Sequence, residues 1–195
     1  ITTNRPSQEF EGSVDFLYEP DHGEQVFSGM ISGGLSDKVA GRLAVRYEGM
    51  DGWWDNKLLD EEGPNRDNLM IRTSLLWDAA DTVEVLFKYE HGDFETKALP
   101  AVVYQSDQPL NFRGESPFPI IDDHDKGAID ALSSNDTTLD NLVATVNWEL
   151  DFATFTSITA YSQYDLETLR DSDWTAATAL HSNRFEDYEQ ISQEL

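Results

Sequence analysis

The stretch NLMIRTSLLWDAADTVEVLFKYEHGDF, residues 68–94, decides the fold class. On both sides of the corner at residues 78–81, apolar side chains alternate with mostly polar ones, which predicts a β-hairpin. If Trp77 faces Val83, the apolar side chains of the two arms form one continuous surface. Each arm has roughly the 9–11 residues that a tilted strand needs to cross a bilayer, more than the ~5–6 of an ordinary soluble strand.

The same alternation recurs along the chain. It predicts about eight strands, at roughly residues 12–19, 26–35, 39–49, 67–77, 82–94, 139–150, 153–165 and 184–195. A short helix is compatible with residues 126–133. The facing of 153–165 stays open, because Phe155 and Tyr161 share one side while Ile158 and Ala160 share the other.

The predicted connections alternate in length. Residues 36–38, 78–81 and 151 are short corners, whereas 50–66, 95–138 and 166–183 are long and polar. Outer-membrane barrels have short periplasmic turns and long extracellular loops, and a soluble sandwich has no reason to sort its connections in this way. The expected fold is therefore an all-β, antiparallel up-and-down transmembrane β-barrel, of which this chain supplies only about eight strands.

The alternation also assigns the two faces. We expect Tyr47, Trp77, Tyr89 and Trp148 to belong to aromatic girdles at the two membrane interfaces. The opposite face is expected to line a watery lumen with Arg42, Arg46, Arg72, Glu84 and Lys88.

Composition excludes several classes of protein. With 38 acidic and 13 basic residues the net charge is -25, which argues against nucleic acid as a partner. No run approaches the ~20 apolar residues of a membrane helix. The mean hydropathy of -0.51 does not exclude a barrel, because alternation hides the apolar residues. The absence of Cys removes disulfides and thiolate metal sites.

Catalytic motifs are missing from the sequence. It contains no Gly-x-Ser-x-Gly, His-Glu-x-x-His or Gly-x-x-x-x-Gly-Lys, and its four His residues are scattered. The run Asp122-Asp-His-Asp125 lacks the spaced ligand register of a calcium loop, so we interpret it as a solvated acidic loop. We expect no enzyme, no catalytic residue, no cofactor and no metal site.

Several segments carry a resemblance to a known family. Residues 1–12, with Ile1-Thr-Thr-Asn-Arg-Pro6 followed by Phe10-Glu-Gly12, resemble the junction between plug and barrel of TonB-dependent outer-membrane receptors. Gly41-Arg-Leu-Ala-Val-Arg-Tyr47 followed by Asp51-Gly-Trp53 is similar to the family's third barrel strand and its loop. Residues 157–161 and 185–195 resemble later strands. The chain departs from the family in having no TonB box, no folded plug and far fewer than 22 strands.

The resemblance implies a division into a junction at 1–11 and a partial barrel at 12–195, cut from a longer protein in the outer membrane of a Gram-negative bacterium. It implies active transport of a scarce ligand, such as a ferric siderophore, cobalamin or a glycan. TonB would act through a segment absent from this chain, and outer-membrane lipid would surround the wall. The small-molecule ligand would bind the extracellular loops, where we expect its contacts at Trp53, Trp54, Arg113 and Trp174, because aromatic and Arg side chains on exposed loops often anchor ligands.

Two other readings remain open. A soluble carbohydrate-binding β-domain would use the same loop Trp residues but would pack its apolar face into a second layer. A complete small outer-membrane barrel would close residues 12–19 onto residues 184–195.

Overall fold

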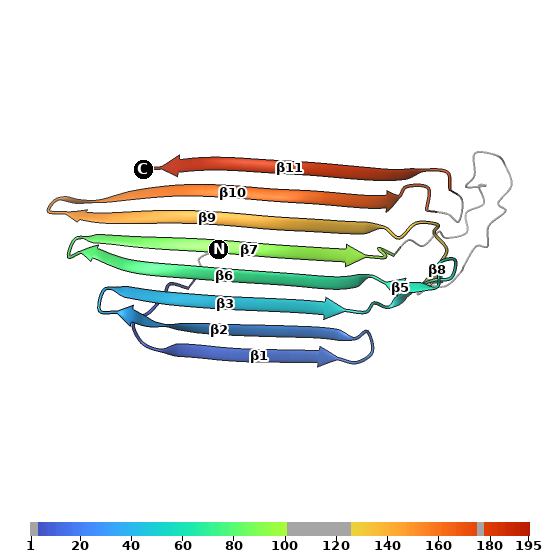
Figure 1. Ribbon diagram of the computed structural model, residues 1–195, viewed down its shortest axis with the longest axis horizontal. Coiled ribbons are helices and arrows are strands. Elements are labelled where there is room, and N and C mark those ends of the chain that lie inside the picture. Colours follow the sequence, from blue (N-terminus) through green and yellow to red (C-terminus); the bar gives the residue numbers. More distant parts are fainter. Residues whose placement is uncertain (1–3, 101–125, 175–177) are drawn as a thin grey trace.

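The computed structural model describes residues 4–100, 126–174 and 178–195, which form eleven strands and no helix. Eight long strands build one antiparallel up-and-down sheet (Figure 1). This part of the expected fold class is confirmed. Across the sheet the strands are β1 (Glu11–Glu19), β2 (Glu24–Ser36), β3 (Val39–Met50), β6 (Asn65–Ala80), β7 (Val83–Lys97), β9 (Ser134–Leu150), β10 (Ala153–Asp171) and β11 (His181–Glu194).

Three short strands form a second sheet beside the long connections. The central one, β4 (Trp54–Asn56), pairs antiparallel with β5 (Glu61–Gly63) and parallel with β8 (Lys126–Gly127). The sequence predicted only a polar loop at 50–66, and the expected helix at 126–133 is wrong. Pairing with β4, a partner far away in the sequence, decides the conformation of β8, and local residue preferences do not encode it.

Strand ends agree with the sequence except around the later loops. The structure starts β9 at residue 134 rather than 139 and extends β10 to 171 rather than 165, so the expected loop at 166–183 shrinks to 172–180. These extensions are polar, and cross-strand backbone pairing continues through them where the hydrophobic pattern has already stopped.

The register of the central hairpin differs from the expected one by two residues. Trp77 pairs with Val85, not Val83, because the turn is tighter than expected, with only residues 81–82 between the arms, and a bulge between Asp78 and Ala80 offsets one residue of this change. Since side chains alternate with a period of two, this shift keeps every apolar side chain on its expected face. In β10, pairing with β9 places Phe155 on that same face.

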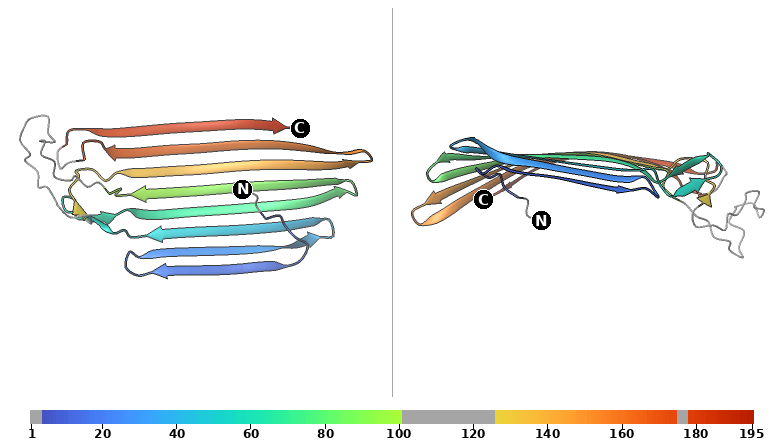
Figure 2. Two further views of the ribbon diagram at one scale, coloured as in Figure 1. Left: turned by 180° about the vertical axis from the view of Figure 1, so that it is seen from behind. Right: turned by 90° about the horizontal axis from the view of Figure 1, so that it is seen from below.

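The connections are sorted between the two ends of the sheet. Two-residue turns join β2 to β3, β6 to β7 and β9 to β10 at one end. The connections at 51–64, 98–133 and 172–180 leave from the other end, on the left of the left-hand view in Figure 2. The alternation expected from the sequence is confirmed for these six connections, whereas the short connection at 20–23, between β1 and β2, lies at the same end as the long ones.

The sheet is open. Strand β1 pairs only with β2, and β11 pairs only with β10, so each of these outer strands leaves one edge without a partner strand in the described part of the chain. The alternative of a complete small barrel required β1 to pair with β11. The structure does not have that pairing.

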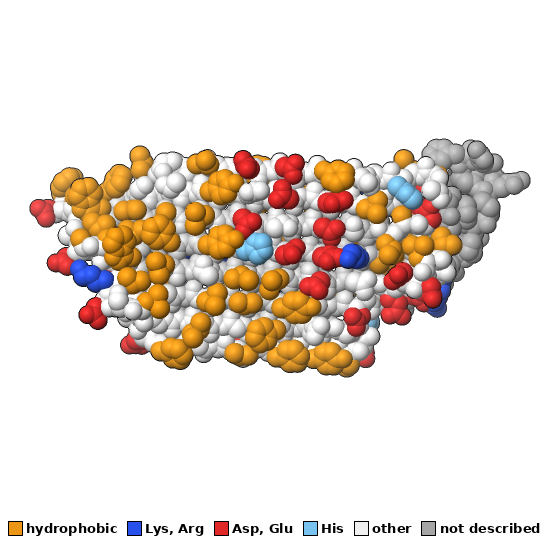
Figure 3. Space-filling model, in the orientation of Figure 1, with side chains coloured by type: hydrophobic (Ala, Val, Ile, Leu, Met, Phe, Trp, Pro, Cys, Tyr) orange, Lys and Arg blue, Asp and Glu red, His pale blue; other side chains and the backbone are white. Residues whose placement is uncertain are grey.

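One face of the sheet, here called the apolar face, carries large exposed hydrophobic side chains (Figure 3). Through the strand registers they all lie on the same side, and each is between 37% and 77% exposed. They are Val14, Phe16, Phe27, Ile31, Leu43, Leu75, Trp77, Phe87, Tyr89, Leu142, Trp148, Phe155 and Ile191. Among the described residues no second layer covers this face, contrary to what a soluble sandwich requires.

The opposite face, called the polar face, carries charged side chains at the same positions along the strands as the apolar side chains of the apolar face. Arg42 pairs with Glu11 at 3.5 Å, and Arg72 pairs with Glu90 on the adjacent β7. The five residues expected in a lumen (Arg42, Arg46, Arg72, Glu84 and Lys88) all lie here. The described residues contain no helix that is long and apolar enough to span a membrane.

The segment before β1 runs across the polar face, as the view from behind in Figure 2 shows. The backbone N–H of Ser7 donates to the Ser32 hydroxyl at 3.2 Å, and the N–H of Gly34 donates to the Gln8 carbonyl at 3.2 Å. Further along, Arg5 forms an ion pair with Glu84 of β7. These contacts anchor residues 5–8 to two strands, β2 and β7, and Ser32 is only 2% exposed beneath them.

Candidate functional site

The apolar residues form a diagonal band. On each strand, the last apolar residue before the polar part near the loops marks the limit of the band. These limiting residues are not all cross-strand partners of one another, so they do not lie on one cross-strand row. They are Tyr18, Phe27, Tyr47, Leu69, Tyr89, Leu142, Tyr161 and Ile191, in order from β1 to β11. The polar part beyond is acidic on β7, β9, β10 and β11, with Leu169 and Phe185 as apolar exceptions, and it is visible as red side chains in Figure 3.

The slope of this limit has a geometric meaning. Tyr47 pairs with Leu69, which pairs with Asp93, so the limit drops by four residues between β6 and Tyr89 of β7. The drop occurs in two steps, of two residues between β1 and β2 and of four residues between β6 and β7; the limit follows one row across β2, β3 and β6 and another across β7, β9, β10 and β11. In total it drops about six residues, or roughly 20 Å, across seven strand spacings of roughly 4.8 Å each. A straight boundary with this total drop makes an angle of about 30° with the cross-strand rows, which run perpendicular to the strands. This angle is near the 35–45° tilt of strands in membrane barrels.

The height of the band is nearly constant. It runs from Val39 to Tyr47 on β3 and from Leu142 to Leu150 on β9, nine residues in each case. Nine to eleven residues is the length of a tilted transmembrane strand. The expected girdle residues lie at the edges of the band, with Trp77 and Trp148 beside the turns and Tyr47 and Tyr89 at the upper limits of their own strands.

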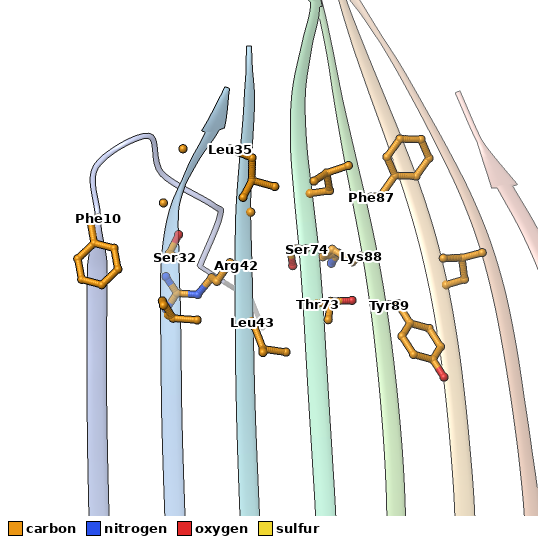
Figure 4. Close-up of a pocket in the computed structure, with 16 residues that line it drawn as sticks. Phe10, Ser32, Leu35, Arg42, Leu43, Thr73, Ser74, Phe87, Lys88 and Tyr89 are labelled. Carbon is orange, nitrogen blue, oxygen red and sulfur yellow. The ribbon is translucent and has the colours of Figure 1, made fainter. Parts of the chain in front are cut away.

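A hollow of about 580 Å³ interrupts the apolar face near the turn end (Figure 4). Its floor contains Gly33 and Gly41, which face each other across β2 and β3, and its walls include Phe10, Leu43 and Phe87. A Cβ at Gly41 would come within 3.1 Å of Leu35 Cδ1. Leu35 and Phe10 pack against these glycines, and the depression offers mostly apolar contacts on its open side.

A small core orders the loop end. The side chains of Trp54 and Ile129 are 0% and 1% exposed. Asn56 connects two segments, because its Nδ2 donates to the Ile129 carbonyl at 3.0 Å and its Oδ1 accepts from the Leu58 N–H at 3.0 Å. The expectation that Trp54 lies on an exposed loop is wrong, since burial in this core against a distant segment is a tertiary effect.

A cluster of ionisable side chains lies next to this core. Asp171 ends β10 and pairs with His181, the first residue of β11, while Asp130 comes from the segment after β8. His181 Nε2 lies 2.7 Å from Asp130 Oδ1. One donor atom from each of the three side chains lies within 4.8 Å of the others. No other cluster of this kind occurs among residues 4–100, 126–174 and 178–195.

Asp171 is held firmly in place. It is 0% exposed, its N–H donates to the Ser133 hydroxyl at 3.2 Å, and its Oδ1 accepts the N–H groups of Asp173 and Trp174 at 3.1 and 2.9 Å. Its Oδ2 is buried and has no hydrogen-bond partner within the part of the chain that the structure describes. A buried carboxylate oxygen in this state is costly and requires an explanation.

The surroundings shift the ionisation of the cluster. Burial, with a contribution from neighbouring carboxylates, raises the pKa of Asp171 above its ordinary value. The hydrogen bond to Asp130 raises the pKa of His181. Burial alone would raise the pKa of Asp130, but hydrogen bonds from Thr178 and His181 outweigh it and lower the pKa. The cluster therefore stabilises the protonated form of His181 relative to a free imidazole.

The expected ligand contacts are scattered over the loop end. Trp53 and Trp174 are 43% and 53% exposed and remain available to a ligand, whereas Trp54 is buried. Arg113 and the run 122–125 lie outside the described residues. The sequence analysis missed Asp130, Asp171 and His181. A correct placement of the ends of β10 and β11 would have paired Asp171 with His181, but no sequence signal connects either to Asp130.

Comparisons with known proteins found no matching family model, no matching curated protein and no matching solved structure.

Proposed function

We propose that this chain forms part of the wall and extracellular loops of a TonB-dependent outer-membrane receptor that imports a scarce ligand. The observation that supports membrane insertion best is the diagonal apolar band, nine residues high on β3 and on β9, on a sheet whose other face is charged. Water must solvate the polar face, and nothing in the described structure covers the apolar one. A lipid environment outside and an aqueous lumen inside satisfy both faces.

The arrangement of the ends supports the same proposal. Short turns at one end would face the periplasm, and the long connections with the small sheet β5-β4-β8 would lie outside the cell. The free edges of β1 and β11 would pair with further barrel strands, since unpaired edges are costly in hydrocarbon. Residues 5–8, which cross the polar face, would connect the wall to a plug inside the lumen.

Single cysteines test insertion, because the chain has none of its own. Val45 and Gln163 lie on one cross-strand row of the apolar face, but Val45 falls inside the band and Gln163 above it. In intact cells, a membrane-impermeant maleimide should label Gln163→Cys and not Val45→Cys. Equal labelling of both variants, or recovery of the protein in the soluble periplasmic fraction, would contradict insertion.

The finer claim of TonB-dependent import needs its own measurement. Uptake of radiolabelled ferric siderophore, cobalamin and a glycan is compared in cells with and without TonB, each with and without the protein. The proposal expects uptake of one of these ligands only when both proteins are present. Equal uptake in the absence of TonB would show a passive pore instead.

A further inference from the structure

We propose that Asp130, Asp171 and His181 bind a divalent transition-metal ion of the Zn²⁺ type at the loop end of the sheet. Two independent features point to a ligand there. The first is the convergence of three ligand atoms from three segments. The second is a property of Asp171, the buried member of this cluster: its Oδ2 has no hydrogen-bond partner among the described residues. A metal ion would supply the missing partner of this oxygen.

The chemistry of the ligands selects the class of ion. Imidazole nitrogen suits Zn²⁺, Cu²⁺, Fe²⁺ and Ni²⁺, whereas Ca²⁺ and Mg²⁺ prefer oxygen ligands alone. One imidazole and two carboxylates are all ligand types that Zn²⁺ accepts, and three protein ligands leave at least one coordination position for water or another ligand. His181 is exposed, so an ion can enter from solvent.

The geometry requires only small movements. Ligand atoms around a tetrahedral Zn²⁺ lie roughly 3.3 Å apart, given metal–ligand distances of about 2.0–2.2 Å. The imidazole of His181 and the carboxylate of Asp130 are already 2.7 Å apart, and all three ligand atoms lie within 4.8 Å. Asp171 therefore has to approach by at most about 1.5 Å, and its backbone is already fixed by the β10–β11 pairing.

The ion would connect two parts of the chain that the strand pairing of the large sheet does not connect directly. It would tie the segment after β8 to the hairpin of β10 and β11, next to the core of Trp54 and Ile129. The cluster lies ten residues beyond Tyr161, the limit of the apolar band on β10, so the site would be in water whether or not the band enters a membrane. The inference does not depend on the proposed transport function.

Titration with Zn²⁺ alone tests the site. The detergent-solubilised full-length protein, stripped with EDTA and dialysed, is titrated by calorimetry in a non-chelating buffer. We expect one saturable Zn²⁺ per chain, and a loss of affinity of at least tenfold in His181→Gln and in Asp171→Asn. The Asn variant keeps Oδ1 for the turn N–H groups of residues 173 and 174, so the local fold is preserved.

The chain offers a matched control. His91 also contacts a carboxylate, Asp140, at 3.0 Å, but none of the residues that the structure describes adds a third metal-ligating side chain there. His91→Gln should bind Zn²⁺ like the unmodified protein. X-ray absorption of the Zn²⁺ complex should show one imidazole, and excess Ca²⁺ should not displace the ion. Equal affinity in all three variants, or displacement by Ca²⁺, would overturn the proposal and indicate only diffuse binding to acidic residues.

Discussion

The diagonal band makes a sharp prediction about two leucines that the sheet places on one row. Leu43 of β3 and Leu142 of β9 are connected through Thr73 and Tyr89 in the cross-strand register, and both lie on the apolar face. They are similarly exposed, at 40% and 50%. Leu43 lies at the centre of the band on β3, whereas Leu142 lies at the limit of the band on β9.

A charge at these two positions should therefore have very different effects. An Arg facing lipid costs about 2–4 kcal/mol at the bilayer midplane and about 0–1 kcal/mol near the interface. We expect Leu43→Arg to lower the free energy of unfolding by about 2–4 kcal/mol and Leu142→Arg by at most about 1 kcal/mol. Leu43 is roughly 13 Å along its strand from the limit at Tyr47, which is far enough to prevent an Arg side chain from reaching the interface easily.

The assay is reversible unfolding of the full-length protein in phosphatidylcholine vesicles, followed by tryptophan fluorescence in guanidinium chloride. Leu43→Ala and Leu142→Ala are the controls, because they remove the same apolar side chains without adding charge. If the two Arg variants lost equal stability relative to their Ala controls, the membrane plane would run along the rows and the inferred tilt would be wrong. If neither lost stability beyond its control, the apolar face would not contact lipid.

Three further predictions concern other parts of the chain. Arg46→Ala should lower stability by less than about 0.5 kcal/mol in the same assay, because its ion pair at 3.7 Å lies on the wet polar face; a larger loss would place this residue in a dry environment. Gly52→Ala should open the small sheet at a cost of about 1–3 kcal/mol, because φ is 106° and the new Cβ would come 2.4 Å from the backbone of Gly63. Hydrogen exchange of the β4 amides measures this, and unchanged protection would contradict it. In metal-free protein the contact between His181 and Asp130 should stabilise the loop end at pH values below the unfolded-state pKa of His, about 6.5. This stabilisation should be lost as the pH rises through the raised pKa of folded His181. NMR titration of the imidazole, with His181→Gln as control, measures this pKa, and a value below that of a free His would refute the prediction.

The sequence by itself determined the strands and, except for residues 153–165, their faces. Alternation with a period of two around residues 68–94 encodes which side chains share a surface, and this information survives a register error of two residues. The tight turns were also predictable, since Asp, Lys and Thr at the corners of 37–38 and 81–82 favour turns locally. The eight long strands, their order and the sorting of their connections followed from these local signals.

Only the tertiary structure decided the loop end and the slope of the band. The burial of Trp54, the strand at Lys126–Gly127 and the meeting of Asp130 with Asp171 and His181 depend on segments that lie far apart in sequence, and no local pattern specifies such partners. The sequence of each strand shows where its apolar part ends. The cross-strand registers are needed to compare these end points between neighbouring strands, and only this comparison reveals the diagonal limit. Local alternation thus fixes the faces, whereas long-range backbone pairing fixes the register and the site.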